Sequence, residues 1–276
     1  MPKKDHHKRR IKAITFDLWE TLLFERDGQS ARRSSARCKD MAEALKTVGI
    51  KIPAEKVDLA LKETVSSLLK VWDTGKDVTH LDQIQLVVKH ASGGSVALKE
   101  KWVDVLSSAY VSAFFEVSSY LNPDANEVLK WLRSRNKLVG LICNTGVTPA
   151  FALRRFLDDQ GLGEYFDTMI FSDEVGVRKP DPRIFHLAAE RLKAKPSEVV
   201  HVGDNLKCDV WGAKNAGFEA VCFSCAMGRD RIAESDPTSL VSISRKLGNL
   251  AADEIVPDAT ITSLSMLKQI IEEQEL

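Results

Sequence analysis

Apolar and polar residues alternate in blocks that indicate strands at both ends of the chain and helices between them. Residues 11–23, IKAITFDLWETLL, begin with a run of β-branched and aromatic residues that stops at Asp17. A short apolar run that ends at a polar residue predicts a buried strand running into a loop. From about residue 24 to residue 122, by contrast, apolar residues recur at helical spacing, as between Val57 and Trp72 and between Trp102 and Ala113. This stretch predicts a bundle of helices whose aromatic side chains pack against one another.

After residue 122, strand-like and helical segments take turns. Helices are expected to begin at Asn122-Pro123, at Thr148-Pro149, and at Asp181-Pro182, where Asp181 is interpreted as a helix cap. Another helix ends at Gly217, and the last begins at Ser263. Such alternation predicts a parallel sheet with helices on both faces, the doubly wound α/β class. The strand-like runs are residues 138–143, 168–172, 198–203 and 219–223, with a short one near Thr260.

Two segments have no clear pattern of this kind. Residues 228–254 are expected to form a loop and a weak helix. Residues 1–10 carry a basic cluster from Lys3 to Arg10 without interleaved aromatic residues, so we expect a solvated, poorly ordered tail.

Charge and composition narrow the classes of function. The 276 residues contain 39 Lys and Arg against 39 Asp and Glu, so net charge provides no attraction to nucleic acid or to membrane surfaces. No apolar run reaches the roughly 18 residues of a membrane span, and the N-terminal segment lacks the pattern of a secretory signal. Five scattered cysteines favour reduced thiols and a cytoplasmic protein. Cys222-x-x-Cys225 is interpreted as small residues ending a strand, because no second pair stands at metal-ligand spacing.

Polar residues follow several of the predicted strands. They are Asp17, residues 143–145, Lys179 in the loop after the third strand, and Gly203-Asp204. The carboxyl ends of parallel strands meet at one edge of a sheet, where ligands bind in this class of fold. Two carboxylates, a lysine and nearby hydroxyl or amide groups suit a phosphate together with Mg²⁺. The expected ligand is therefore a small phosphorylated molecule.

Four segments, in this order, resemble the haloacid dehalogenase-like (HAD) hydrolase superfamily. They are FDLWETL (16–22), LICNTG (141–146), GVRKPDPRIF (176–185) and HVGDNLKCDVWGAKNAGF (201–218). The resemblance implies a Rossmann-like catalytic core made of residues 11–23 and 123–276, with residues 24–122 as an inserted all-helical cap.

The resemblance also implies a role for each matching residue. Asp17 aligns with the nucleophile that forms an aspartyl-phosphate, and Lys179 with the lysine that neutralises its charge. The implied ligands of Mg²⁺ are Asp17, the backbone carbonyl of Trp19, Asp204 and Asp209. The implied phosphate-binding residues are Thr21, Asn144, Thr145 and Lys179. Asn205 is expected to support the metal site, and Cys143 occupies a position where the family usually has Ser or Thr.

One departure from the family pattern bears on the chemistry. Phosphatases of the family carry a second Asp two positions after the nucleophile, as general acid and base, and this chain has Trp19 there. An indole cannot perform that proton transfer, and its loss costs about 10²–10⁴ in rate. Glu20 stands next to it, where the family often has Gly.

Three functions therefore remain open from the sequence. The first is a Mg²⁺-dependent phosphatase, slow or directed to a good leaving group such as an acyl phosphate. The second is a metal-independent 2-haloacid dehalogenase, in which Arg32, Arg33 or Arg37 binds a substrate carboxylate; the Gly203-Asp204 pair argues against it. The third is a non-catalytic protein that binds phosphate or a partner on the same scaffold.

Overall fold

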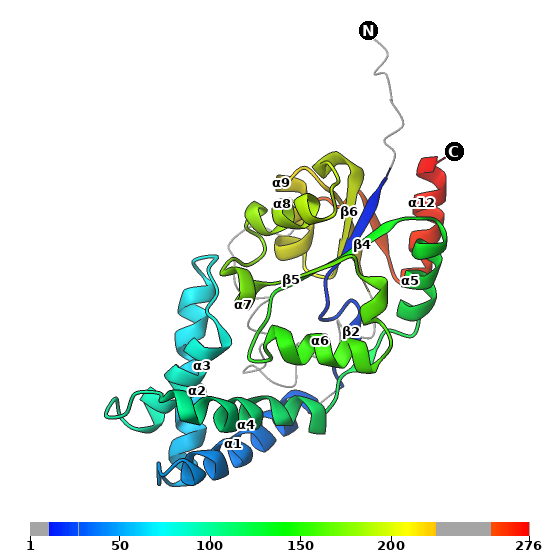
Figure 1. Ribbon diagram of the computed structural model, residues 1–276. Coiled ribbons are helices and arrows are strands. Elements are labelled where there is room, and N and C mark those ends of the chain that lie inside the picture. The colour runs from blue at the N-terminus through cyan, green and yellow to red at the C-terminus, as the bar shows by residue number, and fades with distance from the viewer. Residues whose placement is uncertain (1–10, 27, 225–254, 276) are drawn as a thin grey trace.

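A six-stranded parallel sheet forms the centre of the molecule (Figure 1). The computed structural model describes residues 11–26, 28–224 and 255–275. The strands lie side by side in the order β5, β4, β1, β6, β7, β8. Their bounds are β1 Ala13–Phe16, β4 Leu138–Cys143, β5 Thr168–Phe171, β6 Val199–Gly203, β7 Glu219–Phe223 and β8 Ala259–Ile261. Since β1 pairs with β4 on one side and β6 on the other, the chain winds outward from β1 in both directions.

Alternate side chains of each strand pack on opposite faces of the sheet. Ile14 and Phe16 of β1 belong to one apolar cluster, whereas Ala13 belongs to another. The first cluster is covered by α5 (Ala125–Ser134), α6 (Ala150–Asp159) and α12 (Leu267–Glu275). The second is covered by α8 (Pro182–Arg191) and α9 (Gly212–Asn215). Both faces of the sheet are therefore buried, as the predicted apolar runs require. The fold class predicted from the sequence is confirmed.

Four helices between residues 29 and 116 form a separate layer below the sheet in Figure 1. We call residues 29–116 the helical cap. The four helices of the cap are α1 (Gln29–Thr47), α2 (Ala54–Trp72), α3 (His80–Ala91) and α4 (Val103–Glu116). Their buried apolar side chains form a cluster of their own, with Leu68 and Leu106 among its fully buried members. The predicted helical insertion after the first strand is confirmed, while its limits at residues 24 and 122 stay predictions.

A two-stranded antiparallel ribbon joins the helical cap to the core. Its strands are β2 (Leu23–Phe24) and β3 (Tyr120–Leu121). Two-residue strands are too short to produce a recognisable alternation, so the sequence did not indicate them. The remaining short elements are α7 (Ser172–Val175), the π-helical segment η4 (Leu206–Trp211), and the turns η1 (Glu100–Trp102), η2 (Gly163–Tyr165), η3 (Pro196–Glu198) and η6 (Leu264–Met266).

The strands predicted after residue 122 match the observed ones to within a residue at either end. Asp181 caps α8 as expected, since its side chain accepts a hydrogen bond of 2.9 Å from the backbone N–H of Arg183. The tail at residues 1–10, the segment 228–254 and Cys225 lie outside the described residues. Within the described ranges, no helix is long and apolar enough to span a bilayer.

Candidate active site

Asp17 lies at the carboxyl end of the central strand β1. Its backbone N–H donates to the carbonyl of Val202 on β6 at 2.8 Å, which continues the strand pairing to the residue itself. Neighbouring strands β4 and β6 end at the same edge, so the residues that follow them gather around Asp17. This is the point where strand order reverses, the usual place for a ligand in a doubly wound sheet.

Lys179 connects two of the acidic residues at this edge. Its ammonium group lies 2.6 Å from Asp17 Oδ1 and 2.6 Å from Asp209 Oδ1, and the residue is only 4% exposed. Burial alone lowers the pKa of Lys179, but the two adjacent carboxylates outweigh it and raise the pKa above its usual value. The lysine is therefore held as a cation between Asp17 and Asp209.

The two carboxylates have opposite pKa shifts. Burial raises the pKa of Asp17 to about 8, with the charges of Asp209 and Asp204 acting in the same direction and Lys179 opposing them. Burial also raises the pKa of Asp209, but Lys179 and His201 more than compensate and bring it below the usual range. Burial thus favours the protonated form of Asp17, while Lys179 and His201 keep Asp209 ionised.

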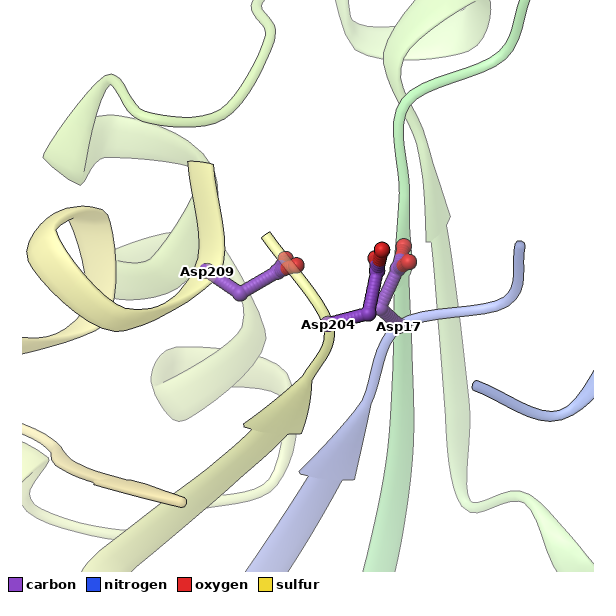
Figure 2. Close-up of side chains that lie close together, drawn as sticks. All are labelled: Asp17, Asp204 and Asp209. Carbon is purple, nitrogen blue, oxygen red and sulfur yellow. The ribbon is translucent and has the colours of Figure 1, made fainter. Parts of the chain in front are cut away.

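Asp204 adds the third carboxylate. Oxygen atoms of Asp17, Asp204 and Asp209 lie within 4.8 Å of one another. Figure 2 shows the carboxylates of Asp17 and Asp204 side by side and pointing the same way, while Asp209 reaches toward them from the helical segment η4. The sequence-predicted acidic residues are therefore brought together at one place.

His201 belongs to this cluster, and our reading of the sequence did not single it out. Its Nε2 lies 3.2 Å from Asp209 Oδ1 and its Nδ1 lies 2.9 Å from the hydroxyl of Thr15. The residue is 1% exposed, and burial lowers the pKa of its imidazole. A neutral ring that donates from Nε2 holds Asp209 in place for Lys179. The available signal was a histidine inside the otherwise apolar strand 199–203.

Two predicted residues position the backbone around the site. Asn144 donates from Nδ2 to the carbonyl of Lys179 at 2.9 Å and accepts from the N–H of Lys179 at 2.8 Å, so its amide holds that residue from both sides. Asn205 accepts from the N–H groups of Lys207 and Cys208 through its Oδ1, which caps η4. The phosphate-binding role expected of Asn144 and the metal-site role expected of Asn205 stay predictions.

Three further predicted residues are set back from the acidic cluster. The hydroxyl of Thr145 bonds to Ser172 Oγ at 3.1 Å and to Asp77 Oδ2 at 3.4 Å, although the residue lines the cavity described below. The hydroxyl of Thr21 is buried without a hydrogen-bond partner among the described residues, and Thr21 is not part of the cavity wall. Cys143 is fully buried within the apolar cluster of the sheet, where burial raises the pKa of its thiol.

The helical cap contacts the core immediately before Lys179. Asp77, between α2 and α3, forms a buried ion pair of 2.5 Å with Arg178 and accepts a bond of 2.7 Å from the indole N–H of Trp72. Backbone bonds from Asp77 to Gly176 and from Arg178 to Gly75 join the two segments as an antiparallel bridge. The loop that carries Lys179 is thus attached to the cap.

A cavity of about 530 Å³ lies between the acidic cluster and the helical cap. Its core side includes Asp17, Lys179 and Asp204, and its cap side includes charged residues of α1 and α2. Much of the remaining wall is apolar and is made of Trp19, Leu61, Val65, Leu69, Trp72, Tyr110 and Val147. A largely apolar wall with a few charged groups is typical of a small-molecule site.

Trp19 occupies the position where an acid–base carboxylate was expected. It lines the cavity and packs edge-on against Phe114 of α4, with ring centroids 6.1 Å apart. The next residue, Glu20, also lines the cavity and has a backbone φ of 57°, the left-handed region that glycine favours. This geometry fits the glycine that is often found at this position in the family that the chain resembles.

Comparison with known proteins identifies relatives of the chain. Residues 11–217 match the family described as haloacid dehalogenase-like hydrolase. The chain is 30% identical over 219 residues to a glyceraldehyde 3-phosphate phosphatase of Pyrococcus furiosus, covering 78% of this chain and 81% of that one. It is 35% identical over 166 residues to a ribulose-1,5-bisphosphate 5-phosphatase of Halopiger xanaduensis, covering 60% of this chain and 62% of that one.

A solved structure also shares the fold. A 2-haloacid dehalogenase from Pseudomonas syringae pv. Tomato DC3000 superimposes with a TM-score of 0.65 at 23% identity, covering 95% of this chain and 99% of that one. At this level of identity the likeness concerns the arrangement of sheet and helical cap.

Proposed function

Because the chain belongs to the haloacid dehalogenase-like hydrolase family, we propose that it is a Mg²⁺-dependent phosphatase that forms an aspartyl-phosphate on Asp17. The observation that carries the proposal is the buried contact of Lys179 with Asp17 and Asp209, beside the carboxylate of Asp204. Relatives named as phosphatases support the choice of reaction.

The donor set fits a magnesium ion. Three carboxylates within 4.8 Å of one another provide the oxygen ligands that Mg²⁺ prefers. Asp17 and Asp204 would hold the ion, with the carbonyl of Trp19 as a further predicted ligand. Both oxygens of Asp209 accept bonds from protein groups, namely Lys179, His201 and the N–H of Asn205, so its first role in this proposal is to hold the lysine. When bound, Mg²⁺ would supply positive charge that favours ionised Asp17 and a crowded phosphate.

The reaction follows from the position of Asp17. Its free carboxylate oxygen forms a bond to phosphorus while the bond from phosphorus to the leaving oxygen breaks. Lys179 neutralises the oxygens that approach Asp17, and its own position is maintained by Asp209 and Asn144. Water then attacks phosphorus while the bond from phosphorus to the Asp17 oxygen breaks, which restores the carboxylate, and the proton that water loses leaves with the inorganic phosphate.

The presence of Trp19 determines which leaving groups we expect the protein to cleave rapidly. No indole can protonate a departing alkoxide, so turnover of alkyl phosphates is expected to be slow. Acyl phosphates leave as carboxylates and do not need that proton. We therefore expect acetyl phosphate to be hydrolysed faster than a simple alkyl phosphate.

The first prediction tests the nucleophile and the metal together. Release of phosphate from acetyl phosphate and of nitrophenol from p-nitrophenyl phosphate is measured with Mg²⁺ and with EDTA. We expect activity that needs Mg²⁺ and that falls at least about 10³-fold in Asp17→Asn, because the amide is not a nucleophile. Asp159→Asn, an exposed carboxylate on α6, is the matched control and should behave as wild type.

Other outcomes would assign a different function. Turnover retained by Asp17→Asn would overturn the nucleophile. Release of halide from 2-chloropropionate in EDTA, without phosphatase activity, would favour the dehalogenase. Inactivity in both assays, with phosphate still bound, would favour the non-catalytic alternative.

A further inference from the structure

Arg37 is a buried cation of the helical cap that lines the cavity. It lies on α1, is 5% exposed, and its guanidinium stands 5.1 Å from the centre of the Tyr110 ring. Its Nε donates to the carbonyl of Tyr110 at 2.9 Å. One terminal nitrogen, NH2, is buried without a hydrogen-bond partner among the described residues. A permanently charged group is therefore left incompletely satisfied in the wall of the cavity.

Other buried cations nearby are matched to acids. Arg33 pairs with Glu25 and donates to the carbonyl of Val117. Arg178 pairs with Asp77, and Lys179 with Asp17 and Asp209. Within the part of the chain that the structure describes, Arg37 forms no such ion pair. A buried charge that lacks an anion carries a large desolvation penalty, which a bound anion would offset.

We infer that Arg37 binds a second anionic group of the substrate, at the end remote from the phosphate that is cleaved. The inference rests on the proposed phosphatase function and narrows its substrates to phosphorylated acids and bisphosphates, in preference to phosphates of neutral alcohols. Carboxylate and phosphate share the oxygen geometry that a guanidinium recognises with two donors. With Nε bound to Tyr110, the N–H groups of the terminal nitrogens remain as the donors of this guanidinium.

The cavity supports this arrangement. Arg37 and the acidic cluster line the same space of about 530 Å³, and apolar side chains make up much of the rest of its wall. A molecule with an anion at each end and a short carbon body would match both charged regions. Lys62 also lines the cavity but is a weaker candidate than Arg37 for binding the anion, because it is exposed and already pairs with Asp58 at 2.6 Å.

The test uses two pairs of substrates that differ only at the remote end. In the first pair, 3-phosphoglycerate carries a carboxylate where glycerol 3-phosphate carries a hydroxymethyl group. In the second pair, propane-1,3-diol bisphosphate carries a phosphate where 3-hydroxypropyl phosphate carries a hydroxyl group. We expect higher kcat/KM for the doubly anionic member of at least one pair, and the two pairs tell a carboxylate from a second phosphate.

Arg37→Gln should raise KM for the preferred anionic substrate about 10–100-fold, as expected for loss of a charge-assisted bond, and should change KM for its neutral counterpart less than about twofold. Arg37→Lys should recover part of the loss, since it keeps the charge but not the two-donor geometry. Arg32→Gln removes a charge from an exposed position of the same helix and is the matched control.

The outcomes separate this inference from the proposed function. Equal losses on both members of a pair, or no preference of the wild type, would overturn the role of Arg37 while leaving a phosphatase. If no phosphate ester is hydrolysed, the phosphatase proposal fails. Calorimetric binding of 3-phosphoglycerate and of the bisphosphate to wild type and to Arg37→Lys then decides the role of Arg37. Binding of either that weakens in Arg37→Lys supports it, and unchanged binding of both overturns it.

Discussion

At the scale of single residues, the site is a set of buried charges that stabilise one another. Lys179 contacts Asp17 and Asp209, and His201 fixes Asp209 from behind. Each of these side chains would be costly to bury alone, and together they form a chain of hydrogen bonds that reaches Thr15 on β1. In the function proposed above, Trp19 stands where the family pattern has the acid–base Asp.

Trp19→Asp is expected to raise turnover of an alkyl phosphate such as glycerol 3-phosphate by about 10²-fold, because it provides a proton for the departing alkoxide. The gain with acetyl phosphate should be smaller, because its leaving group needs no proton and the added carboxylate can assist only the later attack of water. Trp19→Asn removes the same indole and its contact with Phe114 without adding an acid, and serves as the control. Equal rates for the two variants would show that the missing acid does not limit this protein.

At the scale of elements, the beginning of α3 holds an unusual histidine. Thr79 caps the helix through a capping box with Asp82. His80, the first helical residue, packs its ring against Tyr110 and Phe151, and both ring nitrogens are buried without partners among the described residues. Burial lowers the pKa of His80 to about 4 from 6.5. The positive end of the helix dipole also disfavours a charged ring there.

This lowered pKa predicts a loss of stability in acid. Between pH 6.5 and about 4 the unfolded chain binds a proton at His80 that the folded protein does not, so stability falls as the pH falls, by up to about 1.4 kcal/mol per pH unit. His80→Phe should keep the ring packing and unfold less readily than wild type at pH 4.5, with a smaller difference at pH 7.5, as measured by urea unfolding. His90→Gln, which removes a histidine paired with Glu63 near the other end of α3, should show no such gain.

At the scale of the whole molecule, a buried contact joins the helical cap to the loop that carries Lys179. Asp77 of the cap pairs with Arg178, the residue before Lys179, and also accepts a bond from Ser172. The antiparallel bridge beside it connects the same two segments. The position of Lys179 therefore depends on packing between cap and core as well as on its own loop.

Asp77→Asn should lower stability by about 3 kcal/mol, which corresponds to a Tm about 6–12 °C lower, because Arg178 stays buried without its anion. We expect kcat/KM to fall as well, since Lys179 follows directly in the chain. Asp73→Asn, an exposed acid at the end of α2, is the control. A double-mutant cycle with Arg178→Gln should return a coupling above about 1 kcal/mol, and additive losses would contradict the joint role of the pair.

Much of the core could be predicted from the order of residues alone. Fully buried strands must be apolar along their length and must end at polar groups, so the strands and the residues at their carboxyl ends are visible as local patterns. The same local logic located the cap of α8 at Asp181 and placed Asp204 near Asp17, whereas Asp209 was predicted from the family resemblance. The strands β2 and β3 were not predicted, because two residues are too few to show the alternation of apolar and polar residues that indicates a strand.

The sequence by itself determined the fold class, the helical insertion and the acidic residues at one edge of the sheet, since each depends on periodicity or on short motifs. Only the tertiary structure decided which charges are matched. The structure shows the contact of His201 with Asp209 and the pairing of Asp77 with Arg178, which lie about a hundred positions apart in the chain. It also shows that one terminal nitrogen of the Arg37 guanidinium is buried without a partner among the described residues. Burial and pairing of a charge depend on what the rest of the chain places around it, and no local pattern carries that information.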